Sequence, residues 1–345
     1  MSKMRAVVVE RPGQAHVAHL TVPEPKPTEV LVRVAAAGIC GSDLEVMHGS
    51  RPAAFVRYPV VPGHEWAGTV ARIGSEVRGI AVGDAVVAEG FRSCAVCERC
   101  QEGRTNLCSA GYAETGFTHQ GAFAEFVSVP ARLVHRLPAH SDLGAAAVLE
   151  PTACVAAGLL EADLRPGLRI AVVGAGTLGL LAVSILSLTS PARLALVGSR
   201  KARLELARRL GCDETWDIHD GDPGSSLAGG FDLVFEAANR PEAAATALLL
   251  ARRGGTVILE GISGSSQPAI TADAITTKQL RVQGIFGASS VAWRWAVELF
   301  ASGRLPLADL VSHRFPLERF EAAFDALEDV DSGAVKVELV PTDAA

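Results

Sequence analysis

The sequence predicts an α/β fold in which a doubly wound parallel sheet is combined with a second, β-rich domain. Three observations lead to this prediction. Apolar runs separated by Gly and Pro fill roughly the first 150 residues. Between residues 169 and 259, short apolar runs alternate with helix-like stretches, which is typical of βαβ units. Beyond residue 288 the pattern changes again, so both ends of the chain are expected to build the β-rich domain.

Composition limits the classes of function. The chain has 345 residues, of which 49% are hydrophobic and 20% charged, as expected for a compact protein of two domains. The net charge is −6 and no basic tract indicates nucleic-acid binding. Glu10 interrupts the N-terminal apolar run, which excludes a signal peptide. Residues 170–188 carry no charge, but their early glycines favour a strand-to-helix turn over a membrane span. We therefore expect a cytoplasmic protein.

The β-rich domain begins at the N-terminus and is expected to extend over residues 1–151. Its C-terminal part, residues 288–345, is expected to contain two helices and a closing strand. The strands expected in the first part are Arg5–Val9, Glu29–Ala35, Gly68–Ile73 and Phe123–Val129. The elements expected in the C-terminal part are the helices Ala292–Ala301 and Leu317–Leu327 and the strand Val335–Val340.

Four of the seven cysteines lie in one polar loop, at Cys94, Cys97, Cys100 and Cys108. An odd number of cysteines without an export signal argues against a disulfide framework. Four thiolates at this spacing can enclose one Zn²⁺ tetrahedrally, which leaves no open position and predicts a structural site. Free surface cysteines and an iron–sulfur cluster are the alternatives. The regular spacing disfavours the first, and the neighbouring motifs disfavour the second.

Three phrases carry a second set of potential metal ligands. They are Cys40-Gly41-Ser42-Asp43, Gly63-His64-Glu65 and Leu149-Glu150-Pro151. Each phrase alone is weak, because a single Cys or His in an apolar setting is more often a packed core residue. Together they offer one thiolate, one imidazole and two carboxylates, a set suited to an open catalytic zinc. The Ser42 hydroxyl, two residues beyond the thiolate, would relay a proton.

The middle of the chain carries a glycine fingerprint. Gly174, Gly176 and Gly179 follow a predicted strand, Arg169–Val173, and open a predicted helix that ends near Leu188. In this context the pattern predicts a Rossmann dinucleotide site, with the amides around Thr177 and Leu178 facing the pyrophosphate. The domain is expected to cover residues 152–287. Its further elements are the strands Leu194–Val197, Phe231–Phe235, Thr256–Leu259 and Leu280–Phe286 and the helices Lys201–Leu210 and Pro241–Ala251.

The turn after the second strand of this domain indicates which cofactor is bound. NAD sites place an Asp or Glu there to hold the ribose hydroxyls. Here the turn reads Gly198-Ser199-Arg200-Lys201 and contains no carboxylate. A small residue, a hydroxyl and a guanidinium would receive a 2′-phosphate. The alternative is a helix start with a solvated basic face. We favour NADP(H) over NAD(H).

Taken together, these motifs resemble the zinc-containing medium-chain alcohol dehydrogenase family over essentially the whole chain. The resemblance implies that the β-rich domain is GroES-like and that each chain holds two Zn²⁺ ions. It implies Cys40, His64 and Glu150 as ligands of the catalytic zinc. Glu65 would be a carboxylate able to replace water on the metal, and Asp43 would hold the zinc-bound imidazole.

The resemblance also carries expectations about the reaction. Relatives with a carboxylate at the Glu150 position resemble polyol, sugar and threonine dehydrogenases, and the turn at Gly198 resembles that of NADP-dependent bacterial secondary alcohol dehydrogenases. We therefore expect hydride transfer between a secondary alcohol, of polyol, sugar or cyclitol type, and NADP(H). Many relatives carry a histidine where this chain has Glu45, at the outer end of a proton relay. Glu45 or His48 would take that role here.

Two expectations remain. The substrate pocket is expected near Ser42, Glu45, Tyr58, Phe117 and Phe286, and relatives are dimers or tetramers, commonly joined through the strand that corresponds to Leu280–Phe286. A zinc-free NADPH reductase of activated double bonds, or a non-catalytic binding protein, would share the fold and the fingerprint. The metal-ligand set disfavours both alternatives.

Overall fold

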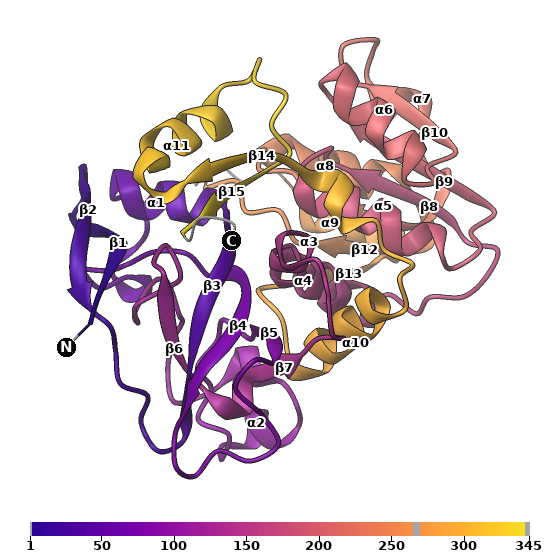
Figure 1. Ribbon diagram of the computed structural model, residues 1–345. Coiled ribbons are helices and arrows are strands. Elements are labelled where there is room, and N and C mark those ends of the chain that lie inside the picture. The colour runs from indigo at the N-terminus through magenta and orange to yellow at the C-terminus, as the bar shows by residue number, and fades with distance from the viewer. Residues whose placement is uncertain (1, 265–269, 342–345) are drawn as a thin grey trace. The chain divides into compact units, whose positions relative to one another are not determined.

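The computed structural model describes residues 2–264 and 270–341, and its backbone divides into two units (Figure 1). One unit combines Met1–Glu150 with Ser289–Ala345, and the other consists of Pro151–Ala288. The helix α4 (Leu149–Leu160) contains the border between them.

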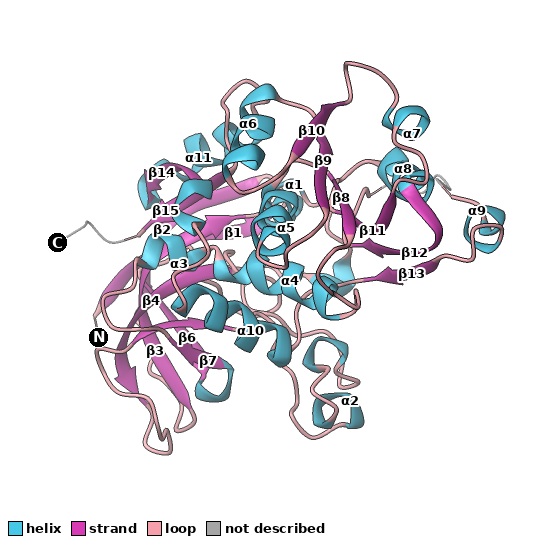
Figure 2. Cartoon of the chain, turned by 90° about the vertical axis from the view of Figure 1, so that its right-hand side faces the viewer, coloured by secondary structure: helices cyan, strands magenta, loops and turns pink. Residues whose placement is uncertain are grey.

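The unit Pro151–Ala288 contains a six-stranded sheet in the order β10-β9-β8-β11-β12-β13, with every neighbouring pair parallel (Figure 2). The chain starts at central β8, builds one half outward to β10, and then returns to build the other half from β11. This order confirms the predicted doubly wound sheet. The strands are β8 (Arg169–Val173), β9 (Arg193–Gly198), β10 (Glu214–Asp217), β11 (Phe231–Glu236), β12 (Ala251–Leu259) and β13 (Arg281–Gly284). The helices between them are α5 (Thr177–Ser187), α6 (Lys201–Arg209), α7 (Pro223–Ser226), α8 (Pro241–Leu250) and α9 (Ala272–Thr276).

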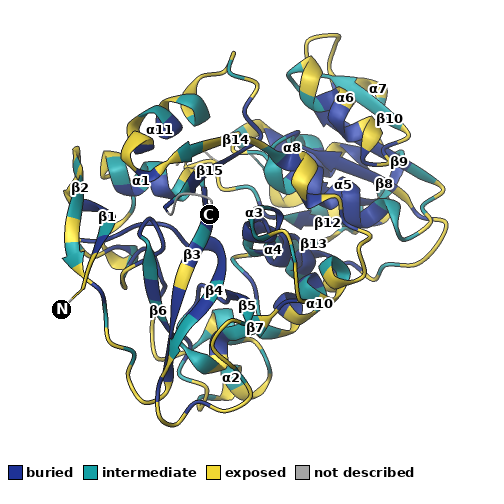
Figure 3. Cartoon of the chain, viewed as in Figure 1, coloured by how far each residue is buried: buried dark blue, intermediate teal, exposed yellow. Residues whose placement is uncertain are grey.

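The uncharged segment 170–188 folds as strand β8, a glycine turn and helix α5. Most of β8 and α5 is buried, and both are largely dark blue in Figure 3. A strand covered on both faces reads as a continuous apolar run, which explains the resemblance to a membrane span. Within residues 2–264 and 270–341, no helix is long and apolar enough to cross a membrane.

The three fingerprint glycines have separate physical roles. Gly174 has a φ of 112°, a conformation that disfavours side chains. A β-carbon on Gly179 would lie 1.8 Å from the Gly174 carbonyl oxygen, so only glycine lets helix α5 approach the turn. Gly176 is the N-cap of α5, and a β-carbon there would meet nothing within 4 Å. Space in front of a helix N-terminus is what a pyrophosphate requires.

The other unit is built on a seven-stranded sheet in the order β14-β15-β3-β4-β5-β7, with β6 paired to β3. All its pairs are antiparallel except β14 with β15, and a separate hairpin joins β1 to β2. The strands are β1 (Lys3–Arg11), β2 (Gln14–Thr21), β3 (Glu29–Ile39), β4 (Glu65–Ile73), β5 (Ala85–Ala88), β6 (Phe126–Pro130), β7 (Val134–Arg136), β14 (Val311–Pro316) and β15 (Lys336–Val340). The α-helices are α1 (Gly41–His48), α2 (Glu98–Gln101), α3 (Leu143–Ala147), α10 (Ser290–Ala301) and α11 (Phe320–Glu328). Short 3₁₀ helices occur at Ala53–Phe55, Thr105–Leu107, Ala131–Leu133, Leu307–Leu310 and Leu317–Arg319.

The sequence missed several short elements of this unit, including β2, β5, β7 and the helices α1 and α3. Helix α1 has only eight residues and a weak apolar periodicity, so its start depends on a cap. The Asp43 carboxylate accepts a hydrogen bond from the Cys40 amide and thereby closes a capping box. The segment beginning at Leu317 starts as a 3₁₀ turn before α11, although the sequence predicts one helix from that residue.

Candidate active site

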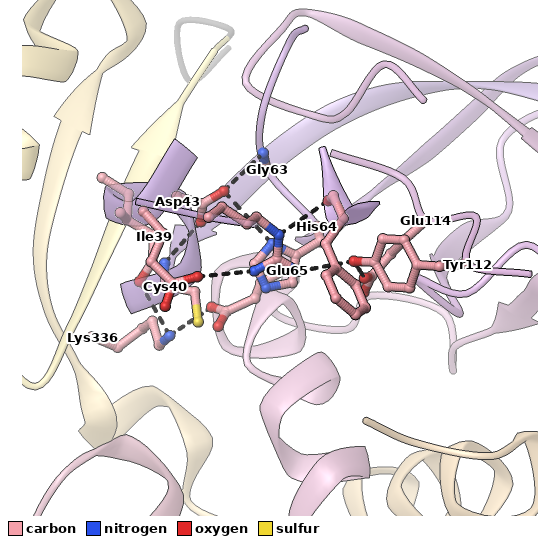
Figure 4. A network of polar contacts seen from close by, with 12 residues as sticks. Ile39, Cys40, Asp43, Gly63, His64, Glu65, Tyr112, Glu114 and Lys336 are labelled. Atoms are coloured by element: carbon pink, nitrogen blue, oxygen red, sulfur yellow. Dashed lines mark hydrogen bonds and ion pairs between the residues drawn. The ribbon is translucent and has the colours of Figure 1, made fainter. Parts of the chain in front are cut away.

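Three side chains from two separate stretches of the unit that contains residues 1–150 converge on one point (Figure 4). Cys40 is the N-cap of α1, His64 directly precedes β4, and Glu65 is the first residue of that strand. The Cys40 sulfur, a His64 ring nitrogen and a Glu65 carboxylate oxygen all lie within 4.8 Å of one another. His64 and Glu65 are buried. A thiolate, an imidazole and a carboxylate at this separation fit a zinc ion.

Asp43 links the two segments that carry these side chains. Its Oδ2 accepts a hydrogen bond from the Cys40 amide at 2.9 Å, and its Oδ1 accepts one from the Gly63 amide at 3.2 Å. The same Oδ1 lies 3.6 Å from His64 Nδ1. Burial opposes protonation of the imidazole, but the Asp43 carboxylate outweighs it and raises the pKa of His64 in the metal-free protein. Asp43 therefore ties the segment of Cys40 to that of Gly63 by hydrogen bonds and places a carboxylate beside the imidazole ring.

Glu150 contributes a further carboxyl group near this set. It lies on α4, outside the group of three whose ligand atoms fall within 4.8 Å. Burial raises its pKa to about 7 in the metal-free protein, the charge of Glu65 adds to the shift, and His64 opposes it. Two nearby carboxylates repel each other when both are charged, and a cation bound between them stabilises the charged form of both.

The four loop cysteines surround a second point. Their sulfur atoms all lie within 4.8 Å of one another, and helix α2 lies between Cys97 and Cys108. The Cys94 amide points to the Cys108 sulfur at 3.3 Å. Hydrogen bonds from Ser109 lower the pKa of Cys97 to about 5, whereas burial raises the pKa of Cys100 to about 11. Four convergent thiols, one already favouring the thiolate, fit a closed metal site.

The turn after β9 contains the residues that are expected to determine the preference for NADP(H) or NAD(H). Arg200 is the N-cap of α6 and has a φ of 68°, and one helical turn later Arg203 adds a second guanidinium. Burial, with the charge of Arg200, lowers the pKa of Arg203 to about 10. A β-carbon on Gly198 would lie 2.6 Å from the Ala175 β-carbon of the fingerprint turn. An acidic residue therefore cannot occupy position 198 unless the fingerprint turn moves.

Comparison with known proteins identifies the family. Residues 26–139 match the model of the alcohol dehydrogenase GroES-like domain, and residues 177–302 match that of the zinc-binding dehydrogenases. The chain belongs to the zinc-containing medium-chain alcohol dehydrogenase family. This membership confirms the predicted family, fold class and enzymatic character.

Individual relatives match over almost the whole chain. The L-threonine 3-dehydrogenase of Bacillus velezensis is 34% identical, with 98% of this chain and 99% of that protein covered. The erythritol/L-threitol dehydrogenase of Mycolicibacterium smegmatis is 32% identical, with 98% of each covered. A zinc-binding dehydrogenase of Sinorhizobium meliloti, solved with NADP, is 33% identical and superimposes with a TM-score of 0.93, covering 99% of this chain and 100% of that one. The 345-residue chain itself is therefore a zinc-type alcohol or polyol dehydrogenase.

The structure of this dehydrogenase adds a residue that the sequence reasoning missed. Lys336, on β15, is 3% exposed, and its Nζ donates hydrogen bonds to Glu65 Oε2 at 2.6 Å and to the Ile39 carbonyl at 3.3 Å. The thiolate of Cys40 and the carboxylates of Glu65 and Glu150 would together carry three negative charges. Lys336 compensates one of them, and the remainder matches a divalent cation. The available signal was a lysine inside the apolar run of the closing strand.

Replacing Lys336 by methionine should destabilise the unit that combines Met1–Glu150 with Ser289–Ala345. Methionine keeps the length of the side chain but leaves the buried Glu65 carboxylate without its partner, which typically costs about 3–5 kcal/mol. We expect a lower free energy of unfolding in urea for K336M, whereas K26M, at a position where the lysine is largely exposed, should behave like wild type. Equal stability of K336M and K26M would show that the pair contributes nothing to folding.

The other predicted residues of the active site lie on or near helix α1. Ser42 is in its first turn and partly exposed, and Glu45 lies one turn later with 41% of its side chain exposed. His48 ends the helix, is 57% exposed, and lies 3.8 Å from Glu328 of α11. Of the two alternatives for an outer relay, Glu45 therefore lies one helical turn from Ser42, whereas His48 lies at the far end of α1 and is paired with Glu328.

The aromatic residues expected in the pocket have different surroundings. The Phe117 ring is buried, and its centroid lies 4.8 Å from that of His64. The Tyr58 hydroxyl donates a hydrogen bond to the Val46 carbonyl at 2.7 Å, so it holds α1 in place. Phe286 belongs to the other unit, where it is exposed.

Proposed function

We propose that this dehydrogenase interconverts a secondary alcohol of polyol, sugar or cyclitol type and the corresponding ketone, with NADP(H) as the hydride carrier. The observation that carries the proposal is the convergence of Cys40, His64 and Glu65, with Glu150 coupled to them. The M. smegmatis relative acts on erythritol and L-threitol, as its name states, which supports a polyol substrate.

In this proposal Cys40, His64 and Glu150 hold the catalytic zinc and the four loop cysteines hold a second, structural zinc. When bound, the catalytic zinc supplies a Lewis acid that polarises the substrate oxygen. Asp43 fixes the orientation of the imidazole and of the cysteine segment. Lys336 keeps the Glu65 carboxylate paired. Ser42 accepts the proton of the substrate hydroxyl and passes it toward solvent along α1, where Glu45 is the next polar group.

The cofactor assignment depends on Gly198, Ser199 and Arg200. A guanidinium forms charge-assisted hydrogen bonds to a phosphate, and the nearby Arg203 adds positive charge. NADP(H) supplies the hydride chemistry, and the protein supplies its position. The S. meliloti relative was solved with NADP, which supports this choice.

We further propose a homodimer or homotetramer joined through β13. This strand lies at one edge of the six-stranded sheet, and an unpaired edge is suited to pairing with its two-fold mate. Light scattering at micromolar concentration should report a mass of two or four chains, and a monomer would contradict the proposal.

Metal analysis tests the assignment of the two sites. The wild-type protein should bind two zinc ions per chain, and C97S should bind one, because an incomplete tetrahedron no longer holds the structural ion. C97S should also melt at a lower temperature. The buried Cys212 lies in the other unit, so C212S is the matched control and should retain both ions. One zinc ion or none in the wild type would instead favour the zinc-free reductase.

A further inference from the structure

Arg51, between α1 and the 3₁₀ turn Ala53–Phe55, is held rigidly by three hydrogen bonds. Its Nε donates to the Phe55 carbonyl at 3.1 Å, its Nη1 to Glu45 Oε2 at 3.1 Å, and its Nη2 to the Tyr112 hydroxyl at 2.8 Å. Only 10% of the side chain is exposed. A buried guanidinium with this many partners has a defined orientation.

One aromatic ring separates this guanidinium from the metal-ligand set. The Arg51 Cζ lies 3.8 Å from the centroid of the Phe117 ring, and that ring in turn packs against His64. Glu45 approaches the same region from α1, whose N-cap is Cys40. The ion pair between Glu45 and Arg51 therefore lies beside the candidate active site, next to the ring that packs against His64.

The inner side of the pair is closed by Tyr112 and Glu114. The Tyr112 hydroxyl accepts from Arg51 and donates to the Glu114 carboxylate, which is buried. The Phe55 ring packs edge-on against Tyr112 at 4.8 Å between centroids. On the other side, the partly exposed carboxylate of Glu45 is accessible to a ligand.

The ion pair of Glu45 and Arg51 retains both an unused hydrogen-bond acceptor and unused donors. A guanidinium has five N–H groups, and three of those of Arg51 are used. Glu45 Oε1 accepts no hydrogen bond from any residue that the structure describes, whereas Oε2 is bound to Arg51. Donor and acceptor therefore stand side by side and their charges cancel. A hydroxyl group, which both donates and accepts, matches this arrangement better than a hydrocarbon or a lone anion does.

We propose that Glu45 and Arg51 bind a substrate hydroxyl group other than the one that is oxidised, and thereby select neutral polyols over monohydric alcohols. The inference rests on the proposed function and specifies its substrate class. It favours a neutral polyol over a substrate that carries a single charge, because the charges of Glu45 and Arg51 cancel.

The test compares 1,5-hexanediol with 2-hexanol, which share a secondary alcohol and differ by one hydroxyl group at the far end of the same carbon skeleton. For the wild type with NADP, we expect kcat/KM to be at least about tenfold higher for the diol than for the monohydric alcohol. A tenfold ratio corresponds to the lower end of the free energy contributed by a hydrogen bond to a charged group. In R51M this ratio should fall about tenfold or more, mainly through a higher KM for the diol. R51K keeps the charge but loses the planar fork, so it should recover only part of the ratio.

The matched control is R57M, because Arg57 is an exposed arginine close in sequence, and it should keep the wild-type ratio. If R51M is too unstable to assay, E45Q removes the charge at nearly constant size and should also lower the ratio. Equal losses of kcat/KM for both alcohols in these variants would reduce Arg51 to a structural role and overturn the inference. Failure of the zinc-loaded wild type to oxidise any secondary alcohol would instead refute the proposed function.

Discussion

C40S and H64A are each expected to lose at least about 10³-fold in kcat, because each removes a ligand of the ion on which the chemistry depends. An open catalytic site contributes to the reaction more than to folding, so circular dichroism should remain that of the wild type. Zinc content should fall by about one ion per chain. Binding of NADPH should persist, because the glycine fingerprint belongs to the other unit.

The control for this pair is H16A, which removes a histidine that is more than half exposed on strand β2. It should retain wild-type activity and both zinc ions. More than about a tenth of wild-type turnover in C40S or H64A would mean that the reaction does not depend on this site, and the mechanism would have to be abandoned.

The second large effect concerns the cofactor. R200A should weaken the binding of NADP(H) about ten- to a hundredfold, because it removes charge-assisted hydrogen bonds to the 2′-phosphate. NAD(H) has no such phosphate, so its binding should change little. The measurement is kcat/KM for both cofactors with one working alcohol. K201A is the matched control, since Lys201 is the next residue and is exposed, and it should leave the cofactor ratio nearly unchanged.

A wild-type preference for NAD(H) would contradict this assignment. The structure then offers a specific alternative acceptor for the ribose, because Asp217 of β10 is the register partner of Gly198 in the parallel pair. Its Oδ1 already accepts the His219 amide, which holds the carboxylate in place. D217N would then be the variant expected to weaken NAD(H).

Local patterns were easier to interpret than contacts between distant residues. The cysteine loop and the glycine fingerprint are each contiguous, so their spacing alone predicted a metal site and a dinucleotide site, whereas the three zinc phrases predicted a metal only when they were taken together. The strongly apolar elements β8 and α5 were predicted nearly to the residue. Helix α1 was missed because its stability comes from a cap and from Tyr58, which binds the Val46 carbonyl, and not from its own periodicity.

By itself, the sequence determined the family, the doubly wound sheet and the candidate ligands, since these depend on local patterns. Only the tertiary structure decided which charges meet in the interior. Lys336 lies 271 positions from Glu65, and Arg51 lies 61 positions from Tyr112, yet both pairs are hydrogen-bonded. The structure also showed that Gly198 is constrained by Ala175 of the fingerprint turn. The physical reason is that burial makes an uncompensated charge or a misplaced methyl group costly, and burial is a property of the folded chain.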